Sequence, residues 1–367
     1  MKIDGTAFRS LWLDETDRWS LRIIDQTKLP WAVEMPRLTT LDQVAHAISA
    51  MLVRGAPLIG ATAAYGVAIA MRADPSDAAL QQAITTLSAT RPTAINLRWA
   101  LNRMQSLLRD HPKAERAEVA YAEAAAICDE DVATNHAIGR HGLGLIRSRA
   151  SAGRRVNILT HCNAGWIATV DWGTALAPIY LAHDEGIDVH VFVDETRPRN
   201  QGASLTAWEL GKHGVKHTVI VDNAGGHLMQ RGEIDMVIVG TDRVTNAGDV
   251  CNKIGTYLKA LAARDNGIPF YVALPSSTID WTIADGLTEI PIEERATTEV
   301  TTMTGRALDG SIATIRIVPK DSLVVNPAFD VTPARLVSGL ITERGVCTAS
   351  AAALSQMFPE YGRQNAA

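Results

Sequence analysis

Cys162 has the widest chemical repertoire of any side chain in this sequence, and it lies where a buried strand should end. Residues 156–160 predict a strand, 161–165 the turn that leaves it, and Gly173 onward a helix. Ligands of open α/β sheets bind at the carboxyl ends of strands, so the thiol would lie beside a substrate, as nucleophile, acid or base. A buried, inert cysteine is the commoner alternative.

Asp242 follows a second buried, β-branched run at 236–240. A carboxyl group in this position can be desolvated enough to hold its proton near neutral pH, as a general acid must, although pairing with Arg243 would oppose this. Asn252 and Lys253 come next, near the predicted start of a helix. A lysine there is unfavourable against the helix dipole unless an anion is present, which favours an anion-binding role for Lys253.

Two arginines precede predicted helix starts. Arg54 is followed by Gly55, Ala56 and a proline suited to a first helical turn, so a phosphate could bind the free N–H groups and the guanidinium together. Arg91 comes directly before a Pro-started helix, with helical spacing over 94–108. For each segment the alternative is an ordinary turn with a solvated arginine.

Polar residues also follow the apolar strand predicted at 189–193. Asp194, Glu195, Arg197 and Gln201 could bind sugar hydroxyls, with Gln201 at the start of the next helix. A purely structural network of the two carboxylates with Arg197 explains the charges equally well.

The elements that must position these groups fall into two regions. Residues 1–40 predict a small antiparallel sheet, and 41–52, 94–108 and 115–147 predict helices. Beyond the polar stretch 147–155, strands at 156–160, 189–193, 218–221, 236–240 and 270–274 alternate with helical segments. We therefore expect a mainly helical N-terminal domain at 1–150 and a Rossmann-like α/β domain with a parallel sheet at 151–367. Residues 326–345 predict a strand, a Pro-bounded turn and a helix.

Composition excludes several classes of function. The formal net charge of -5 provides no basic stripe, so nucleic acid and anionic membranes are not expected partners. The N-terminal stretch lacks an apolar segment with basic flanks, which favours a cytoplasmic protein. Four widely spaced cysteines without a CxxC pair predict free thiols rather than a zinc site or disulfides.

Taken together, several motifs resemble the methylthioribose-1-phosphate isomerase family, which is related to regulatory subunits of the eukaryotic initiation-factor guanine-nucleotide exchanger. The matching motifs include RGAPLIGATAAYG, RPTAINLRWA, ILTHCNAG, VFVDETRPRNQGASLTAWEL, VIVGTDRVTNAGDVCNKIGTY and FYVALPSSTID, in order between about residues 50 and 346. The resemblance implies an aldose–ketose isomerase of methionine salvage that uses no metal or redox cofactor, acts on a small sugar phosphate and forms a homodimer.

The resemblance also implies the site. It places the catalytic residues at Cys162 and Asp242. It places the substrate contacts at Arg54, Gly55, Ala56, Arg91, Gln201, Asn252 and Lys253. Asp242 would protonate the ring oxygen, and Cys162 would remove the C2 proton or stabilise the transition state. A hydride shift would need a dry site, which Trp166 and Trp172 could help to provide.

Other activities remain compatible with these motifs. A 5-deoxyribose-1-phosphate isomerase would need the same groups except for the methylthio pocket, and a non-catalytic sugar-phosphate-binding regulatory protein would share the fold. A ribose-1,5-bisphosphate isomerase would require further cations, for which the sequence has no clear extra cluster.

Overall fold

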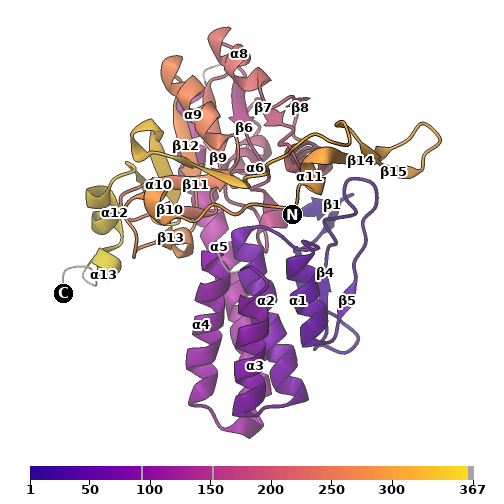
Figure 1. Cartoon of the computed structure of the whole chain (residues 1–367). Coiled ribbons are helices and arrows are strands. Elements are labelled where there is room, and N and C mark those ends of the chain that lie inside the picture. The colour runs from indigo at the N-terminus through magenta and orange to yellow at the C-terminus, as the bar shows by residue number, and fades with distance from the viewer. Residues whose placement is uncertain (92–93, 151–152, 363–367) are drawn as a thin grey trace.

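The computed structural model describes residues 1–91, 94–150 and 153–362, with a helical bundle at one end and a sheet-centred part at the other (Figure 1). As the sequence predicts, the N-terminal strands pair antiparallel. They are Lys2–Ile3 (β1), Thr6–Ala7 (β2), Leu11–Leu13 (β3), Leu21–Ile23 (β4) and Arg37–Leu38 (β5). The bundle comprises Leu41–Ser49 (α1), Ala56–Ala73 (α2), Asp77–Ser88 (α3), Ile95–Arg109 (α4) and Arg116–Arg149 (α5).

Helix α2 is the centre of the bundle because it is apolar on every side. A helix of this composition must be surrounded, and α1, α3, α4 and α5 all pack against it. Within the described ranges it is the one helix long and apolar enough to cross a membrane, but 72% of it is buried inside the protein, as in a core helix. Helix α1 is capped by Thr40, whose side chain accepts a hydrogen bond from the N–H of Gln43.

A sheet with strand order β18-β17-β12-β9-β6-β7-β8 forms the core of the other part. Every neighbouring pair is parallel except β17 with the edge strand β18. The strands are Val156–Thr160 (β6), Val189–Asp194 (β7), His217–Ile220 (β8), Met236–Val239 (β9), Phe270–Ala273 (β12), Gly339–Thr342 (β17) and Gly345–Cys347 (β18). The parallel strands follow the doubly wound order of Rossmann folds, which confirms the predicted α/β class.

Helices cover the sheet and connect it to the bundle. Four helices connect successive strands of the sheet along the chain, and they are Ala177–Asp184 (α6), Ala207–His213 (α7), Ala224–Gln230 (α8) and Thr256–Asp265 (α9). The long helix α5 leaves the bundle and packs on α6 and β17, so it belongs to both parts (Figure 1). The boundary expected at 150/151 directly precedes residues 151–152, which lie outside the described residues.

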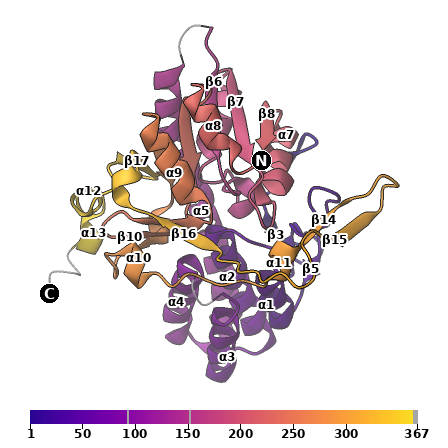
Figure 2. The same cartoon turned by 45° about the horizontal axis from the view of Figure 1, so that its top comes forward.

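A second, four-stranded sheet was not predicted. Its order is β13-β10-β11-β16. The strands are Arg243–Thr245 (β10), Val250–Lys253 (β11), Ile279–Asp280 (β13) and Phe329–Thr332 (β16). The hairpin of Thr302–Arg306 (β14) and Ile312–Arg316 (β15) projects from the body of the protein (Figure 2). Short helices are Gly286–Glu289 (α10), Thr298–Thr301 (α11), Ala351–Met357 (α12) and Pro359–Gly362 (α13).

Three local expectations need correction or fall outside the description. The helix expected from Gly173 begins at Ala177, because Gly173 has a φ of 81° that no right-handed helix contains. The helix expected near the end of 326–345 is instead strand β17, whose residues are all buried in the parallel sheet. Pro92, expected to start a helix, lies outside the described residues, and α4 begins at Ile95.

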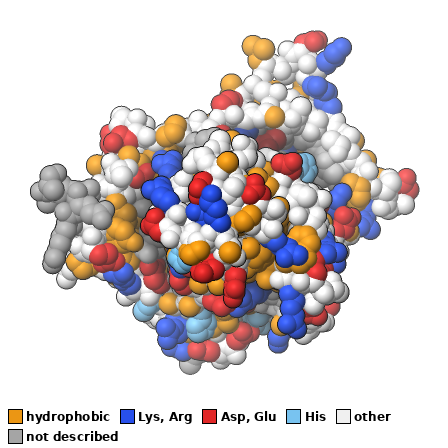
Figure 3. Space-filling view, turned by 90° about the horizontal axis from the view of Figure 1, so that it is seen from below, with side chains coloured by type: hydrophobic (Ala, Val, Ile, Leu, Met, Phe, Trp, Pro, Cys, Tyr) orange, Lys and Arg blue, Asp and Glu red, His pale blue; other side chains and the backbone are white. Residues whose placement is uncertain are grey.

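The face at the free end of the bundle mixes both signs of charge. Lys and Arg side chains alternate there with Asp and Glu, without a continuous basic stripe (Figure 3).

Candidate active site

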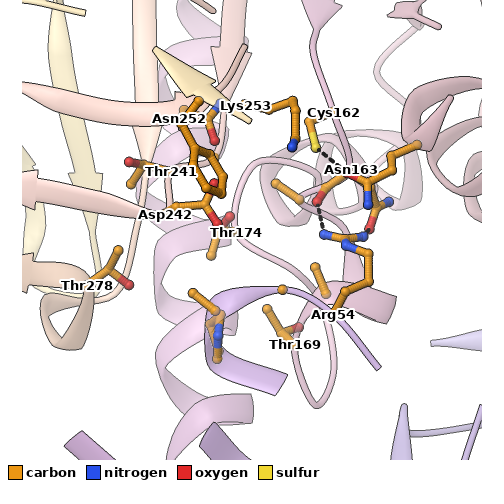
Figure 4. A pocket seen from close by; sticks show the side chains of 18 of the residues that line it. Arg54, Cys162, Asn163, Thr169, Thr174, Thr241, Asp242, Asn252, Lys253 and Thr278 are labelled. Atoms are coloured by element: carbon orange, nitrogen blue, oxygen red, sulfur yellow. Dashed lines mark hydrogen bonds between the residues drawn. The ribbon is translucent and has the colours of Figure 1, made fainter. Parts of the chain in front are cut away.

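Strands β6 and β9 are the neighbours at which the sheet changes its direction of winding. They pair in parallel, with Ile158 opposite Met236 and Leu159 opposite Val237. Their carboxyl ends therefore lie side by side, at the switch point where doubly wound sheets bind ligands. Cys162 follows β6 and Asp242 follows β9, and both line one cavity (Figure 4).

All the residues that the family resemblance implied lie around this cavity. The structure thus brings together segments from the N-terminal helices, from three loops of the large sheet and from the second sheet. The predicted lining residues are Arg54, Gly55, Ala56, Arg91, Cys162, Gln201, Asp242, Asn252 and Lys253.

Cys162 has an unusual backbone conformation, with a φ of 65° in the left-handed region. Three neighbours fix it: its N–H donates to Oγ1 of Thr196 over 2.8 Å, its carbonyl accepts from Oγ1 of Thr206, and its thiol donates to Oε1 of Gln201 over 3.2 Å. Strain of this kind is found where surrounding contacts determine a functional geometry. Burial raises the pKa of the Cys162 thiol, although Arg54 and Lys253 oppose the shift, so the protonated form is favoured.

Asp242 faces Cys162 from the other side of the cavity (Figure 4). Its main-chain N–H donates to the carbonyl of Cys251 over 3.0 Å, which ties the end of β9 to the second sheet. The neighbouring Arg243 lies 3.5 Å from the carboxylate of Asp280. The unpredicted second sheet therefore supplies both the support of Asp242 and an acidic partner for Arg243.

Four cationic side chains surround the cavity. Arg54 donates two hydrogen bonds to Asn163, one to its side-chain oxygen and one, of 2.6 Å, to its carbonyl. Arg91 lies 3.7 Å from the carboxylate of Glu293. Burial lowers the pKa of Arg54, of Arg91 and of Lys253. Such a concentration of buried positive charge is costly unless an anion binds there.

Lys253 differs from Arg91 and Arg295 because it has no acidic partner among the described residues. It lies three residues before α9, near the start of a helix as predicted, but it is the last residue of strand β11. Its ammonium lies 4.7 Å from the ring centroid of Phe329 and forms no salt bridge with any described residue. The Lys253 side chain extends into the cavity and ends beside Cys162 (Figure 4).

Gly55 brings the N-terminus of α2 to the cavity wall. Its φ is 98°, and a Cβ at this position would lie 2.2 Å from the carbonyl oxygen of Ala168. No side chain caps α2, and Pro57 occupies its first turn as predicted. The free N–H groups of an 18-residue helix are thus available to an anion at the cavity.

Sequence reasoning missed three contributors. Arg295, the fourth cation, lies in an irregular segment and is paired with Glu293 at 3.1 Å. Asn163 follows Cys162 in the same turn and could have been proposed from that adjacency. Its amide group donates to the buried carboxylate of Glu209 while its oxygen accepts from Arg54. Nothing in the local sequence of α7 indicates that Glu209 lies beneath the site.

A buried ion network lies next to the Cys162 turn. His161 contacts Oδ2 of Asp194 at 2.9 Å and the carbonyl of Ile254 at 2.8 Å, and the ammonium of Lys259 lies 3.2 Å from the same carboxylate oxygen. His161, Asp194 and Asp222 are close enough together to hold a metal ion. The Lys259 ammonium already supplies positive charge there, and it also donates to the carbonyl of Asp222. Asp194 thus belongs to a structural network, but its partners are His161 and Lys259 rather than the expected Arg197. The guanidinium of Arg197 donates instead to the carbonyls of Pro198 and Val300.

The two tryptophans expected to exclude water do not line this cavity. Trp166 is buried in the core, with its ring 6.1 Å from that of Trp208. Trp172 packs against His136 at 4.8 Å. The apolar part of the cavity wall is formed instead by small residues and by Met51 and Phe329.

The comparison with known proteins agrees with this geometry. The profile of the Initiation factor 2 subunit family matches residues 52–349. A curated relative from Acidiphilium cryptum, called methylthioribose-1-phosphate isomerase, is 82% identical over 367 residues and covers 100% of both chains. The chain belongs to the methylthioribose-1-phosphate isomerase family.

Solved structures related to this isomerase family have the same fold. A 5-methylthioribose 1-phosphate isomerase from Pyrococcus horikoshii superposes with a TM-score of 0.84 at 39% identity, covering 97% of each chain. A protein from A. fulgidus called translation initiation factor eIF-2B, subunit delta, superposes with a TM-score of 0.80 at 38% identity, covering 96% of this chain and 100% of its own. The isomerase and the initiation-factor subunit superpose almost equally well on this chain, so structural similarity does not choose between their functions. The residues of the site have to support that choice.

Proposed function

We propose that this protein is an isomerase of methionine salvage that converts 5-methylthioribose 1-phosphate to 5-methylthioribulose 1-phosphate. The observation that carries the proposal is the convergence of Cys162 and Asp242 on one cavity at the switch point of the sheet. The name shared by the close relatives supports the same reaction.

The phosphate on C1 sets the chemical problem, because a sugar substituted there cannot open spontaneously to a free aldehyde. Opening must be catalysed by a proton delivered to the ring oxygen as its bond to C1 breaks. Asp242 is the proton donor in our proposal, and it recovers a proton from O2 when C2 becomes a carbonyl. The net result moves hydrogen from C2 to C1 and regenerates the carboxylic acid.

Cys162 acts on the C2 side. Its protonated thiol, held by Gln201, stabilises the transition state as a hydrogen-bond donor, or its thiolate removes the C2 proton. The first role corresponds to a hydride shift and the second to a phospho-enediol. Arg54, Arg91 and Lys253 bind the phosphate together with the N-terminus of α2, while Gln201 and Asn252 orient hydroxyl groups.

A turnover assay of the purified protein tests the proposal directly. The 1-phosphates of methylthioribose, 5-deoxyribose and ribose should be compared, and formation of the ketose should be followed. We expect methylthioribose 1-phosphate to have the highest kcat/KM. Absence of turnover with all three sugars would favour the regulatory protein of the same fold instead. In deuterium oxide, label at C1 of the product would support the enediol route.

We also propose that the protein is a cytoplasmic homodimer. The β14–β15 hairpin projects into solvent and carries the exposed apolar side chains of Leu308, Ile312 and Ile315. Such side chains on a projecting arm favour contact with a second copy. Light scattering of the protein and of an Ile312→Asp, Ile315→Asp variant tests this: the variant should be monomeric.

The residues of the site support a functional division of the chain at 150/151. Arg54, Gly55, Ala56 and Arg91 come from the mainly helical region 1–150, and the catalytic pair comes from the Rossmann-like region 151–367. We propose that the first region supplies phosphate binding and the second supplies the chemistry.

A further inference from the structure

Glu209 is a fully buried acidic residue that lies behind the wall of the cavity without lining it. Its side chain belongs to α7 and forms no salt bridge with any described residue. A carboxyl group buried without a cation in direct contact is destabilising, and sequences retain one where it has a task. The contacts of Glu209 indicate what this task is.

Gly165 makes the room that the Glu209 carboxylate occupies. A Cβ on Gly165 would lie 1.9 Å from Oε1 of Glu209, so any larger residue would displace the carboxylate. The φ of Gly165 is -94°, outside the left-handed region, and its backbone conformation therefore does not call for glycine. The turn that carries Cys162 is thus shaped to admit this acidic group.

Asn163 connects Glu209 to Arg54. Its amide nitrogen donates to Oε1 of Glu209 and, over 3.1 Å, to Oγ1 of Thr206. Its side-chain oxygen then faces Nη1 of Arg54, and its main-chain carbonyl accepts from Nη2 (Figure 4). A reversed amide would turn its N–H groups toward the guanidinium N–H groups and leave Glu209 without its donor. The acceptor behind Asn163 therefore determines that an oxygen faces Arg54.

Arg54 differs from two other arginines of the cavity in the way that its position is fixed. Arg91 and Arg295 lie 3.7 Å and 3.1 Å from the carboxylate of Glu293, whereas Arg54 has no salt bridge with any described residue. A carboxylate in direct contact would compete with a phosphate for the guanidinium N–H groups. A carboxylate placed behind Asn163 orients the guanidinium and leaves its remaining N–H groups available.

We propose that Glu209 is a positioning residue for phosphate binding, which fixes the amide of Asn163 and through it holds Arg54 toward the phosphate. This inference rests on the proposed isomerase function and deepens it. The hydroxyl of Thr206 donates to the carbonyl of Cys162 over 2.7 Å, so the thiol-bearing turn has a support of its own. Loss of Glu209 should therefore weaken substrate binding more than the chemical step.

The first experiment separates the length of the Glu209 side chain from its charge. Glu209→Asp keeps the charge but withdraws the carboxylate from Asn163, so KM and the Kd of inorganic phosphate should rise by roughly tenfold or more. Glu209→Gln keeps an acceptor at the same reach and should leave both constants within about threefold. In both variants kcat should stay within about threefold, as expected when only binding is lost.

The matched control shortens a carboxylate elsewhere in the protein. Glu123 accepts a hydrogen bond from Arg103 in the helical bundle, remote from the cavity. Glu123→Asp should leave KM, kcat and the Kd of phosphate unchanged. A rise in Kd equal to that in Glu209→Asp would overturn the assignment.

The second experiment asks whether Glu209 acts through Arg54. In an Arg54→Met background, Glu209→Asp should raise the Kd of inorganic phosphate by less than about twofold, because the group that it positions is absent. In an Arg91→Met background the same substitution should keep its full effect. A full effect in both backgrounds would overturn the proposal. So would weak binding in Glu209→Gln with normal binding in Glu209→Asp, which would show that charge alone matters.

Failure of the proposed function would give a different result from failure of this inference. A protein that turned over no sugar 1-phosphate, but showed the expected changes in the Kd of inorganic phosphate by calorimetry, would refute the isomerase and retain the positioning role. Normal turnover with unchanged KM and Kd in Glu209→Asp would refute the positioning role and retain the isomerase.

Discussion

The thiol of Cys162 donates a hydrogen bond to Oε1 of Gln201, although the two residues leave different strands of the sheet. Gln201 directly precedes the single π-helical turn Gly202–Thr206, and Gly202 packs so tightly that a Cβ there would lie 1.7 Å from the carbonyl oxygen of Asp194. The close contact of Gly202 with the end of β7 thus fixes the position of the Gln201 amide. The amide in turn orients the thiol of Cys162. Irregular turns of this kind are common at functional sites.

Replacing Cys162 with Ala should lower kcat by about 10²- to 10³-fold, because the group acting on C2 is lost. Thermal unfolding should change little. Cys347→Ala, at a half-buried thiol remote from the cavity, is the control and should retain activity. Near-normal kcat in the Cys162 variant would show that the thiol is not catalytic.

Asp242→Asn should lower kcat by about 10²- to 10⁴-fold, since an amide cannot deliver the proton to the ring oxygen. The substrate should still bind, so its Kd, measured by calorimetry, should remain within about tenfold of normal. Asp265→Asn, at an exposed carboxylate, controls for the loss of charge. A variant with unimpaired turnover would exclude Asp242 as the acid.

Lys253→Met should raise KM by roughly 10- to 100-fold, because it removes a buried cation that has no salt-bridge partner among the described residues. Inorganic phosphate should also become a weaker competitive inhibitor. The matched substitution Lys216→Met changes a lysine whose side chain is 63% exposed and should leave both constants unchanged. Equal effects of the two substitutions would contradict phosphate binding by Lys253.

Gly55→Ala should destabilise the protein by about 1–3 kcal/mol or more, measured by urea unfolding. The new Cβ would both occupy a left-handed conformation and meet the carbonyl of Ala168. Gly5→Ala separates these causes, because Gly5 has a φ of 88° but no atom within 4 Å of the added Cβ. We expect the smaller loss at Gly5, and equal losses would show that the contact with Ala168 is unimportant.

Glu209 should make stability depend on pH. Burial raises its pKa from 4.5 to about 7, despite hydrogen bonding by Asn163, so the folded state holds the proton more tightly than the unfolded chain. The contribution of Glu209 to the free energy of unfolding is fully present below pH 4.5 and is lost as the pH rises through about 7. Relative to Glu209→Gln, the free energy of unfolding should therefore fall between about pH 5 and pH 8. The exposed substitution Glu118→Gln should give a curve parallel to that of the unmodified protein.

Local pattern predicted the elements that carry Cys162 and Asp242, the proposed catalytic pair. The apolar, β-branched runs ending before Cys162 and Asp242 are strands β6 and β9, because such runs fit the interior of a parallel sheet. The run at 339–342 is also a buried strand but was expected to be a helix. A short apolar run has no periodicity that distinguishes a buried strand from a buried helix. Its pairing with β12 is what makes this run a strand.

The roles of individual charges could be predicted less well. Segments distant in sequence bury Arg295 and Glu209. The residues next to them in the chain therefore do not indicate that they are buried at the site. Lys253 was expected near a helix start, where it lies, but the strand that holds it was not expected and follows from pairing with Phe329 across β11 and β16. The nine site residues themselves were implied by family resemblance, and the structure brings them to one cavity.

The position of Asp242 after the fourth parallel strand has a consequence for the growing chain on the ribosome. Arg54, Arg91 and Cys162 all emerge earlier in synthesis, so a nascent chain that ends before β9 contains two of the arginines and the thiol but neither Asp242 nor Lys253. Domains fold largely from the N-terminus as they are made. Such a chain has an incomplete phosphate site as well as no acid, so both substrate binding and catalysis would begin only when the second half of the sheet joins the first.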